Sequence, residues 1–273
     1  MNADGGYEEW PAPAALRASV ACLWTRSAPA DPAGPTLILP DGCVDLIWKR
    51  GQGAFVAGPD TGPAPTTIAP DDVLVGVRFR PGAGFALGSP LHELRDRRVD
   101  IAELDRHLAR RLPAELPPQV ALARLAEAAE DRARARPPDP AIREATVLLA
   151  WPRTRVSEIE RAVGLGERQL RRRFDAAVGY GPKMLQRIIR FRHFLGSLDR
   201  APGRPDLARI AFESGYADQA HLSRESARLA GMSPSALAVR RPVVAGNGLD
   251  VRTPAQGAST LPGSGRRSGG AWL

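Results

Sequence analysis

The sequence predicts an α+β protein in which a β-rich N-terminal domain precedes an all-α domain. Up to about residue 85, short apolar runs alternate with Pro and Gly, which is typical of short strands joined by turns. From about residue 100, apolar residues recur at three- and four-residue spacing, which is typical of helices. A length of 273 residues is enough for two domains with separate cores. We therefore expect a barrel-like β domain with helices, followed by a domain made of helices alone.

Four segments have strand character and two later ones have helix character. The runs TLILP, VDLIW, GAFVAG and VLVGVRF are rich in Val, Ile and Leu and lie between turn signals. The segment DIAELDRHLARRL follows with helical spacing. In QVALARLAEAAEDRARA, Leu122, Leu125 and Ala129 recur at the same spacing. These patterns assign the strands and the first helices to one N-terminal domain.

A cluster of prolines divides the chain. The prolines of ARPPDPA cannot continue a helix, so we place a linker at residues 137–140. The N-terminal domain then comprises residues 1–136 and the helical domain residues 141–241. Residues 242–273 contain few apolar residues and many Gly, Ser and Pro, which predicts a disordered tail.

Positive charge is concentrated in the C-terminal half. Residues 1–140 contain 16 basic and 19 acidic residues, a net charge of −3. Residues 141–241 contain 19 basic and 10 acidic residues, a net charge of +9, and the rest of the chain adds +2. This distribution is typical of a polyanion-binding domain joined to a near-neutral one, although solvation alone also accounts for surface charge.

The composition argues against a membrane-spanning, secreted or zinc-stabilised protein. No run approaches the roughly 18 apolar residues that a membrane helix needs. The start, MNADGGYEEW, is acidic and lacks the basic and apolar regions of a secretory signal. Cys22 and Cys43 are too few for a disulfide framework or a four-thiolate zinc site. We expect a cytoplasmic protein with no membrane partner, no metal and no cofactor.

The most specific feature is an internal repeat in the basic half. Two segments align with an offset of 51 residues, which becomes 52 after one insertion. The aligned pairs are Val156 with Leu207, Ile159 with Ile210, Gly164 with Gly215, Leu170 with Leu222, Arg172 with Arg224, Gly179 with Gly231, Pro182 with Pro234 and Leu185 with Leu237. Agreement of this extent indicates two copies of one structural unit.

Each copy is interpreted as two helices joined by a tight turn, at about residues 156–176 and 207–230. In the first copy Gly164 permits a left-handed turn. Leu170 and Phe174 then form the inner face of the second helix, which leaves the neighbouring arginines outside. In the second copy Asp218 is suited to cap the second helix. Such a pair of helices is a helix-turn-helix, and PKMLQRIIRFRHFLGSLDR between the copies predicts one long connecting helix.

Three segments carry a family resemblance. GLGERQLRRRFDAAVGYGPK, QRIIRFRHFL and IAFESGYADQAHLSRESARLAGMSPSAL resemble the C-terminal DNA-binding region of the AraC/XylS family of bacterial transcription regulators over about 100 residues. The resemblance implies that the two units contact successive major grooves on one face of double-stranded DNA. The DNA-binding residues expected from the resemblance and from the outer helix faces are Arg168, Gln169, Arg171, Arg172, Gln219, Ala220, His221, Ser223 and Arg224.

The chemistry of these side chains suits DNA, and some have a second interpretation. Arg can donate two hydrogen bonds to guanine and Gln can bind adenine, whereas other contacts go to phosphates. Arg173 lies nearer the inner face, where a salt bridge or solvation is an equal alternative. His221 is as well explained as a surface or partly packed residue.

Two positions depart from the family pattern. Gly166 stands where a capping Ser is usual, which should weaken the start of the first recognition helix. Ser226 stands where a Phe is usual, and the repeat places it opposite Phe174, facing the core of the second unit.

The N-terminal domain carries a weaker resemblance. PDGCVDLIW, GVRFRPGAG and HELRDRRVDIAEL are similar to the sensor-like domain of some AraC-type regulators, over roughly residues 14–112. The resemblance implies a small-molecule effector or dimerisation. Asp41, Cys43 and Asp45 are the candidate effector-binding residues. The alternative is that Asp41 and Gly42 form a turn while Cys43 packs as a small apolar residue.

Two other functions compete with DNA binding: an enzyme and a protein-interaction domain. An enzyme domain of the Cys-based alkylation-repair type needs four thiolates, and a cupin-like enzyme needs clustered His, whereas His92 and His107 lie far apart in sequence. A protein-interaction helix-turn-helix would present apolar or aromatic anchors where this sequence has Arg. We therefore expect a non-enzymatic regulator that binds duplex DNA and a small-molecule effector, forms a homodimer and contacts RNA polymerase.

Overall fold

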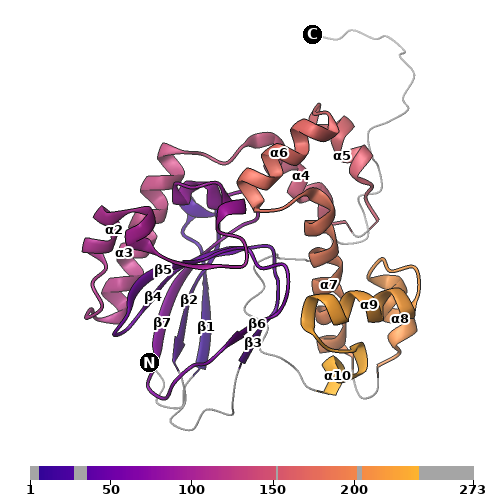
Figure 1. The fold of residues 1–273 in the computed structure, drawn as a ribbon, viewed down its shortest axis with the longest axis horizontal. Helices are drawn as coiled ribbons and strands as arrows, with labels where there is room; N and C mark the ends of the chain where they lie inside the picture. Colours follow the sequence, from indigo (N-terminus) through magenta and orange to yellow (C-terminus); the bar gives the residue numbers. More distant parts are fainter. Residues whose placement is uncertain (1–5, 28–35, 152, 202–204, 240–273) are drawn as a thin grey trace, which may run out of the picture.

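The structure is a computed structural model that describes residues 6–27, 36–151, 153–201 and 205–239. The predicted tail at residues 242–273 lies outside the described residues. A β-rich part comes first and a helical part follows, as the sequence predicts (Figure 1).

A six-stranded antiparallel sheet forms the centre of the N-terminal domain. Within the described residues, its two outer strands, β1 (Gly6–Pro11) and β8 (Arg98–Asp100), pair with one neighbour each. A separate two-stranded sheet pairs β3 (Thr36–Ile38) with β6 (Ala64–Thr66). The strands of the large sheet are, in spatial order, β1 (Gly6–Pro11), β2 (Val20–Ser27), β7 (Val73–Phe79), β4 (Val44–Lys49), β5 (Gly53–Ala57) and β8 (Arg98–Asp100).

One face of this sheet packs against α3 (Pro118–Ala135). Alternation along β4 and β7 places Leu46, Trp48 and Phe79 on this face, where all three are completely buried. Burying each such side chain contributes roughly 1.5 to 3 kcal/mol. This core holds α3, the sheet and the short 3-10 turn Ala14–Leu16 together as one domain.

The segment DIAELDRHLARRL does not form one helix. It is divided into α1 (Ile101–Leu104) and α2 (Arg106–Arg111) at Asp105, whose backbone is extended. The Asp105 carboxylate accepts hydrogen bonds from the N–H groups of His107 and Leu108, both at 2.9 Å. An N-cap within the segment therefore ends one helix and starts the next.

The helical domain is arranged around one long helix, α7. Figure 1 shows α7 between a first group of helices at one end and a second group at the other. It spans Pro182–Arg200, the bounds predicted for the connecting helix. The first group is α4 (Pro140–Leu149), α5 (Val156–Val163) and α6 (Glu167–Val178), and the second is α8 (Leu207–Glu213), α9 (Gln219–Ala230) and α10 (Pro234–Val239).

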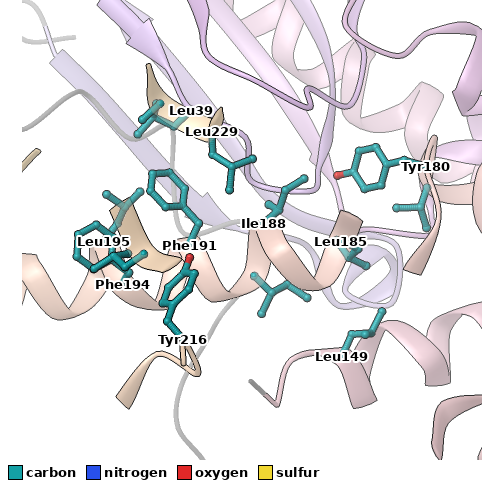
Figure 2. Packing of buried hydrophobic residues seen from close by; sticks show 14 of the residues in the cluster. Leu39, Leu149, Tyr180, Leu185, Ile188, Phe191, Phe194, Leu195, Tyr216 and Leu229 are labelled. Atoms are coloured by element: carbon teal, nitrogen blue, oxygen red, sulfur yellow. The ribbon is translucent and has the colours of Figure 1, made fainter. Parts of the chain in front are cut away.

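The core of this domain is continuous from one group to the other. Figure 2 shows Leu185, Ile188 and Phe191 of α7 within the cluster, with Leu149 and Tyr216 from the two groups. Among the described residues of the N-terminal domain, Leu39 is the one fully buried member of this cluster. The helical domain therefore has a core almost entirely of its own.

The structure confirms the internal repeat. Gly164 and Gly215 have φ angles of +66° and +85° in the turns between paired helices. Gly179 and Gly231 have φ angles of +96° and +67° after α6 and α9. Only glycine adopts these conformations without strain, which explains why the repeat carries glycine at all four positions.

Ser226 faces the core, as its alignment with Phe174 predicts. Both side chains are fully buried. The Ser226 hydroxyl forms no hydrogen bond with the described residues. A buried hydroxyl without a partner costs roughly 1 to 3 kcal/mol of stability.

We predict that Ser226→Ala raises the free energy of unfolding by about 1 kcal/mol, because it removes this desolvated hydroxyl and leaves little empty volume. Ser223→Ala on the same helix is the control, since it makes the same change in helix propensity but removes a half-buried hydroxyl that has a hydrogen-bond partner. Urea unfolding of both variants measures the difference. A gain in Ser223→Ala equal to that in Ser226→Ala would assign the effect to propensity alone.

Candidate nucleic-acid interface

The first recognition helix, α6, separates an apolar inner face from a basic outer face. Leu170 and Phe174 are buried against α7 and α4. The predicted DNA-binding residues of this helix, Arg168, Gln169, Arg171 and Arg172, are all exposed. Gly166 precedes the helix and provides no side-chain cap, in agreement with the weak start expected there.

The second recognition helix, α9, begins with a side-chain cap. The Asp218 carboxylate accepts a hydrogen bond of 2.6 Å from the N–H of His221, which confirms the predicted cap. Gln219, Ala220 and Arg224 are exposed. These three side chains lie on the outer face of the second unit. The exposed residues of α6 lie on the corresponding face of the first unit.

Two of the predicted residues on α9 are partly engaged within the protein. The ring of His221 packs edge-on against Tyr216, with the ring centroids 5.3 Å apart. The Ser223 hydroxyl donates a hydrogen bond of 2.9 Å to the carbonyl of Gln219. Both side chains are half-buried. His221 is therefore partly packed, which is the alternative to a base contact that the sequence allows.

The arginines of α6 divide into two classes. Arg173 is half-buried and forms an ion pair of 3.2 Å with Asp139, which also caps α4. This ion pair is the structural alternative that the sequence left open for Arg173. Arg171 and Asp175 are 3.9 Å apart on the surface, where such pairs contribute little. Arg168 and Arg172 form no ion pair with the described residues and remain available to an anion.

A cavity lies on the face of the N-terminal sheet that α3 does not cover. Its volume is about 110 Å³, and the β3–β6 pair contributes to its opposite wall. A cavity of about 150 Å³ in another protein binds benzene, so this one is of a similar scale but smaller. Three aromatic side chains line it: Tyr7, Trp24 and Phe55.

Trp24 lies flat on the sheet because Gly76 opposite it has no side chain. A Cβ atom at Gly76 would lie 2.4 Å from the indole ring. The indole N–H donates a hydrogen bond of 2.7 Å to Asp45. Glycine within a strand often marks such a close approach. The floor of the cavity is therefore an indole ring hydrogen-bonded to a half-buried carboxylate.

Asp41, Cys43 and Asp45 all line this cavity. The Asp41 carboxylate also accepts a hydrogen bond of 2.8 Å from the N–H of Cys43, across a turn at Gly42 with a φ of +85°. Cys43 is buried. The structure thus contains the turn at Asp41 and Gly42 and the packed Cys43 thiol of the alternative interpretation. Asp41 and Cys43 also form part of the cavity wall.

The central polar group of the cavity, Arg78, was missed in the sequence. Its guanidinium lies 3.1 Å from Asp45, 3.4 Å from Glu9 and 3.6 Å from Asp41. Burial alone would lower the pKa of Arg78, but the carboxylates of Asp45 and Asp41 outweigh it and hold this pKa well above its usual value. An arginine inside the apolar run VLVGVRF was the available signal, since buried charges are rare unless paired.

Neither cysteine has the environment of a reactive thiolate. Burial raises the pKa of the Cys22 thiol to about 12 and that of Cys43 well above its usual value. Among the described residues, no group of three or more His, Cys, Asp and Glu side chains is arranged to hold a metal ion. No described helix has the length and apolar character needed to cross a membrane.

The cavity wall contacts the helical domain. A Cβ atom at Gly42 would lie 2.9 Å from the Leu185 side chain on α7 and 3.8 Å from the Tyr180 hydroxyl. Tyr180 is buried, and its hydroxyl forms no hydrogen bond with the described residues. The turn that carries Asp41 and Cys43 is therefore packed against the first turns of the helix that joins the two units.

Two further contacts reach both units. A Cβ atom at Gly179, after α6, would lie 2.4 Å from the Pro59 ring and 3.2 Å from the carbonyl of Leu91. A Cβ atom at Gly231, after α9, would lie 3.8 Å from the Pro63 ring. The 3-10 turns Gly84–Leu87 and Leu91–Glu93 also pack against α6. The N-terminal domain thus contacts α6, α7 and the end of α9.

Comparison with known families agrees with this geometry. A family model described as a helix-turn-helix domain matches residues 159–240, which include both recognition helices and α7. This is an AraC-type helix-turn-helix domain. A second model, described as a domain of unknown function (DUF6597), matches residues 8–100 and so covers the sheet and the cavity in front of the AraC-type domain. No curated protein matches the sequence.

Solved structures of ToxT from Vibrio cholerae are similar to this chain. One covers 85% of this chain and 98% of its own, with 11% identity and a TM-score of 0.44. Another covers 80% and 95%, with 11% identity and a TM-score of 0.41. A third, with a bound unsaturated fatty acid, covers 75% and 93%, with 10% identity and a TM-score of 0.38.

We predict that Gly179→Ala destabilises the full chain more than Gly164→Ala does. Both substitutions place a side chain at positive φ in the AraC-type domain, with a strain of about 1 kcal/mol. Gly164 faces open space, whereas an Ala at residue 179 would collide with Pro59 of the N-terminal domain. The extra cost, about 1 to 3 kcal/mol for an overpacked contact, is measured by urea unfolding. Equal costs would show that the domains are not in tight contact at Gly179.

Proposed function

We propose that this chain is a sequence-specific DNA-binding transcription regulator of the AraC type, controlled by a small molecule and acting in the cytoplasm. The observation that carries the proposal is the repetition of one basic surface. Arg172 and Arg224 occupy equivalent repeat positions on α6 and α9, and both are exposed above a buried leucine two residues earlier. A single helix, α7, joins the two units and packs against helices of both.

The proposed binding mode assigns one major groove to each recognition helix. Exposed arginines on α6 and α9 suit the O6 and N7 acceptors of guanine, and Gln219 suits adenine. Adjacent major grooves on one face of DNA are about 34 Å apart, so the binding site contains two short elements about one helical turn apart. Asp218 supports this role indirectly, because it orients the first turn of α9 through its cap.

We further propose that the cavity beside Trp24 holds the effector. Three arginines and three aspartates line its polar part, which therefore carries no net charge, and three aromatic rings line its apolar part, which suits a small molecule with an apolar portion. Asp41, Cys43 and Asp45 are the proposed effector contacts. Because the turn at Gly42 packs on Leu185, a ligand that moves this turn changes the contact with α7.

The proposal divides the chain at residues 137–140, with sensing in residues 1–136 and DNA binding in residues 141–241. The packing of α3 on the sheet and of α4 on α5, α6 and α7 supports this division. We also propose a homodimer and a contact with RNA polymerase. The open edge of β1, on which Trp10 is exposed, is the surface that best supports self-association. With both thiols buried, the proposal includes no enzymatic step.

Arg172→Ala and Arg224→Ala are each expected to weaken binding to the operator by about 1 to 3 kcal/mol and to relax preference at one base pair. The physical reason is the loss of a paired hydrogen bond to a base. The operator is located by footprinting the region upstream of the gene, and affinities are measured by fluorescence anisotropy.

Arg161→Ala on α5 is the matched control, because it removes an exposed positive charge outside the recognition helices. Unchanged affinity and selectivity in both recognition-helix variants would contradict the proposed surface. Absence of duplex binding by the wild-type chain at low salt would favour the protein-interaction alternative.

Filling the cavity is expected to abolish the response to the effector and to leave DNA binding in place. Ala57 lines the cavity on β5, and Ala57→Phe adds a volume comparable to the empty space. Ala57→Ser is the control that preserves the cavity. Footprints are compared with and without a low-molecular-weight cell extract. A response in folded Ala57→Phe that matches the wild type would place the effector elsewhere.

A further inference from the structure

A basic groove lies between the two helix-turn-helix units. We call it the interunit groove. It runs from the residues before α5 of the first unit, along α7, to His221 on α9 of the second unit. Five of its lining residues are basic and none is acidic. The basic residues are Arg153, Arg155, Lys183, Arg187 and Arg190.

The spacing of three basic residues on α7 places them on one face. Lys183, Arg187 and Arg190 follow one another at intervals of four and three residues, so they form one stripe along the helix. The intervening Leu185, Ile188 and Ile189 are buried in the core. The pattern that anchors α7 in the core therefore also presents a row of positive charge in the interunit groove.

The groove residues are not neutralised to the same extent. Arg187 forms an ion pair of 2.6 Å with Glu225 on α9, which also pairs with Arg228 at 3.3 Å. This contact fixes α7 against the second recognition helix. Lys183 and Arg155 are exposed and have no ion-pair partner among the described residues. The groove therefore keeps accessible positive charge next to an ion pair between half-buried Arg187 and buried Glu225, which holds its wall in place.

We propose that the interunit groove binds the sugar–phosphate backbone of the DNA between the two major grooves, with Lys183 and Arg155 as phosphate contacts. The proposal rests on the proposed DNA binding and adds a third contact region to the two recognition helices. Charge complementarity carries it: the lining is basic without a carboxylate, and the groove joins the two units that engage the same duplex. A protein partner would need apolar anchors, and the lining offers Val156 alone among large aliphatic side chains.

The phosphate role predicts a specific salt dependence. In Lys183→Ala, the slope of log affinity against log salt concentration is expected to decrease in magnitude by about 0.9, because one phosphate contact is lost. Binding to the operator and to a random duplex of equal length should weaken by the same factor, since a phosphate contact carries no sequence information. Arg155→Ala should behave in the same way.

Arg200→Ala is the matched control. Arg200 is exposed in the last turn of α7 and does not line the groove. The Arg200→Ala substitution therefore removes one positive charge from the same helix, at the end opposite Lys183. Its slope should equal that of the wild-type chain. A duplex with neutral methylphosphonates between the two footprinted elements should lower the affinity of the wild-type chain more than that of Lys183→Ala, because the variant has one phosphate contact fewer to lose.

The outcomes separate this proposal from the proposed function. Wild-type slopes in both Lys183→Ala and Arg155→Ala, with intact operator binding, would overturn the groove proposal alone. Weakened binding to the operator but not to the random duplex would also overturn it, because it would indicate a base contact. Absence of any duplex binding by the full wild-type chain would overturn both proposals. Thermal melts of each variant verify that the fold is retained.

Discussion

The burial of α7 is the constraint on which the DNA-binding half depends. Its apolar residues complete the cores of both units, so neither recognition helix can move far without breaking contacts made by the same helix. Burial of residues such as Phe191 and Phe194 makes those contacts strong. The separation of α6 and α9 is therefore a property of α7. The N-terminal domain packs on the first turns of α7 at Gly42, so the helix that joins the two units also contacts the wall of the cavity.

The helical half was predictable because its signals are local. Helix bounds follow from three- and four-residue apolar spacing, and the turns follow from glycines that tolerate positive φ. The repeat added information that one copy alone lacks: it placed Ser226 in the core by comparison with Phe174, although serine is normally exposed. The inner position suspected for Arg173 was also correct, and its partner, Asp139, lies 34 residues away in sequence.

The sheet and its cavity were much less predictable because they are non-local. Strand β1 is mostly exposed and polar, so it lacks an apolar signal, and it becomes a strand by pairing with β2. The cavity combines residues from β1, β2, β4, β5 and β7 on a face that no single strand pattern identifies. Arg78 shows the difficulty: its importance depends on three carboxylates that only the fold brings together. The groove residues on α7 were missed for the same reason, since their meaning depends on the second unit across from them.

The unequal starts of the two recognition helices imply that their first turns differ in stability. Asp218 satisfies an N–H group in the first turn of α9, whereas the first turn of α6 follows Gly166 and has no side-chain acceptor. Unsatisfied N–H groups at a helix start are natural donors to a phosphate oxygen. The first turn of α9 is therefore better satisfied than the first turn of α6. A missing side-chain cap costs a helix about 0.5 to 2 kcal/mol, so the N-terminus of α6 should fray more readily than that of α9.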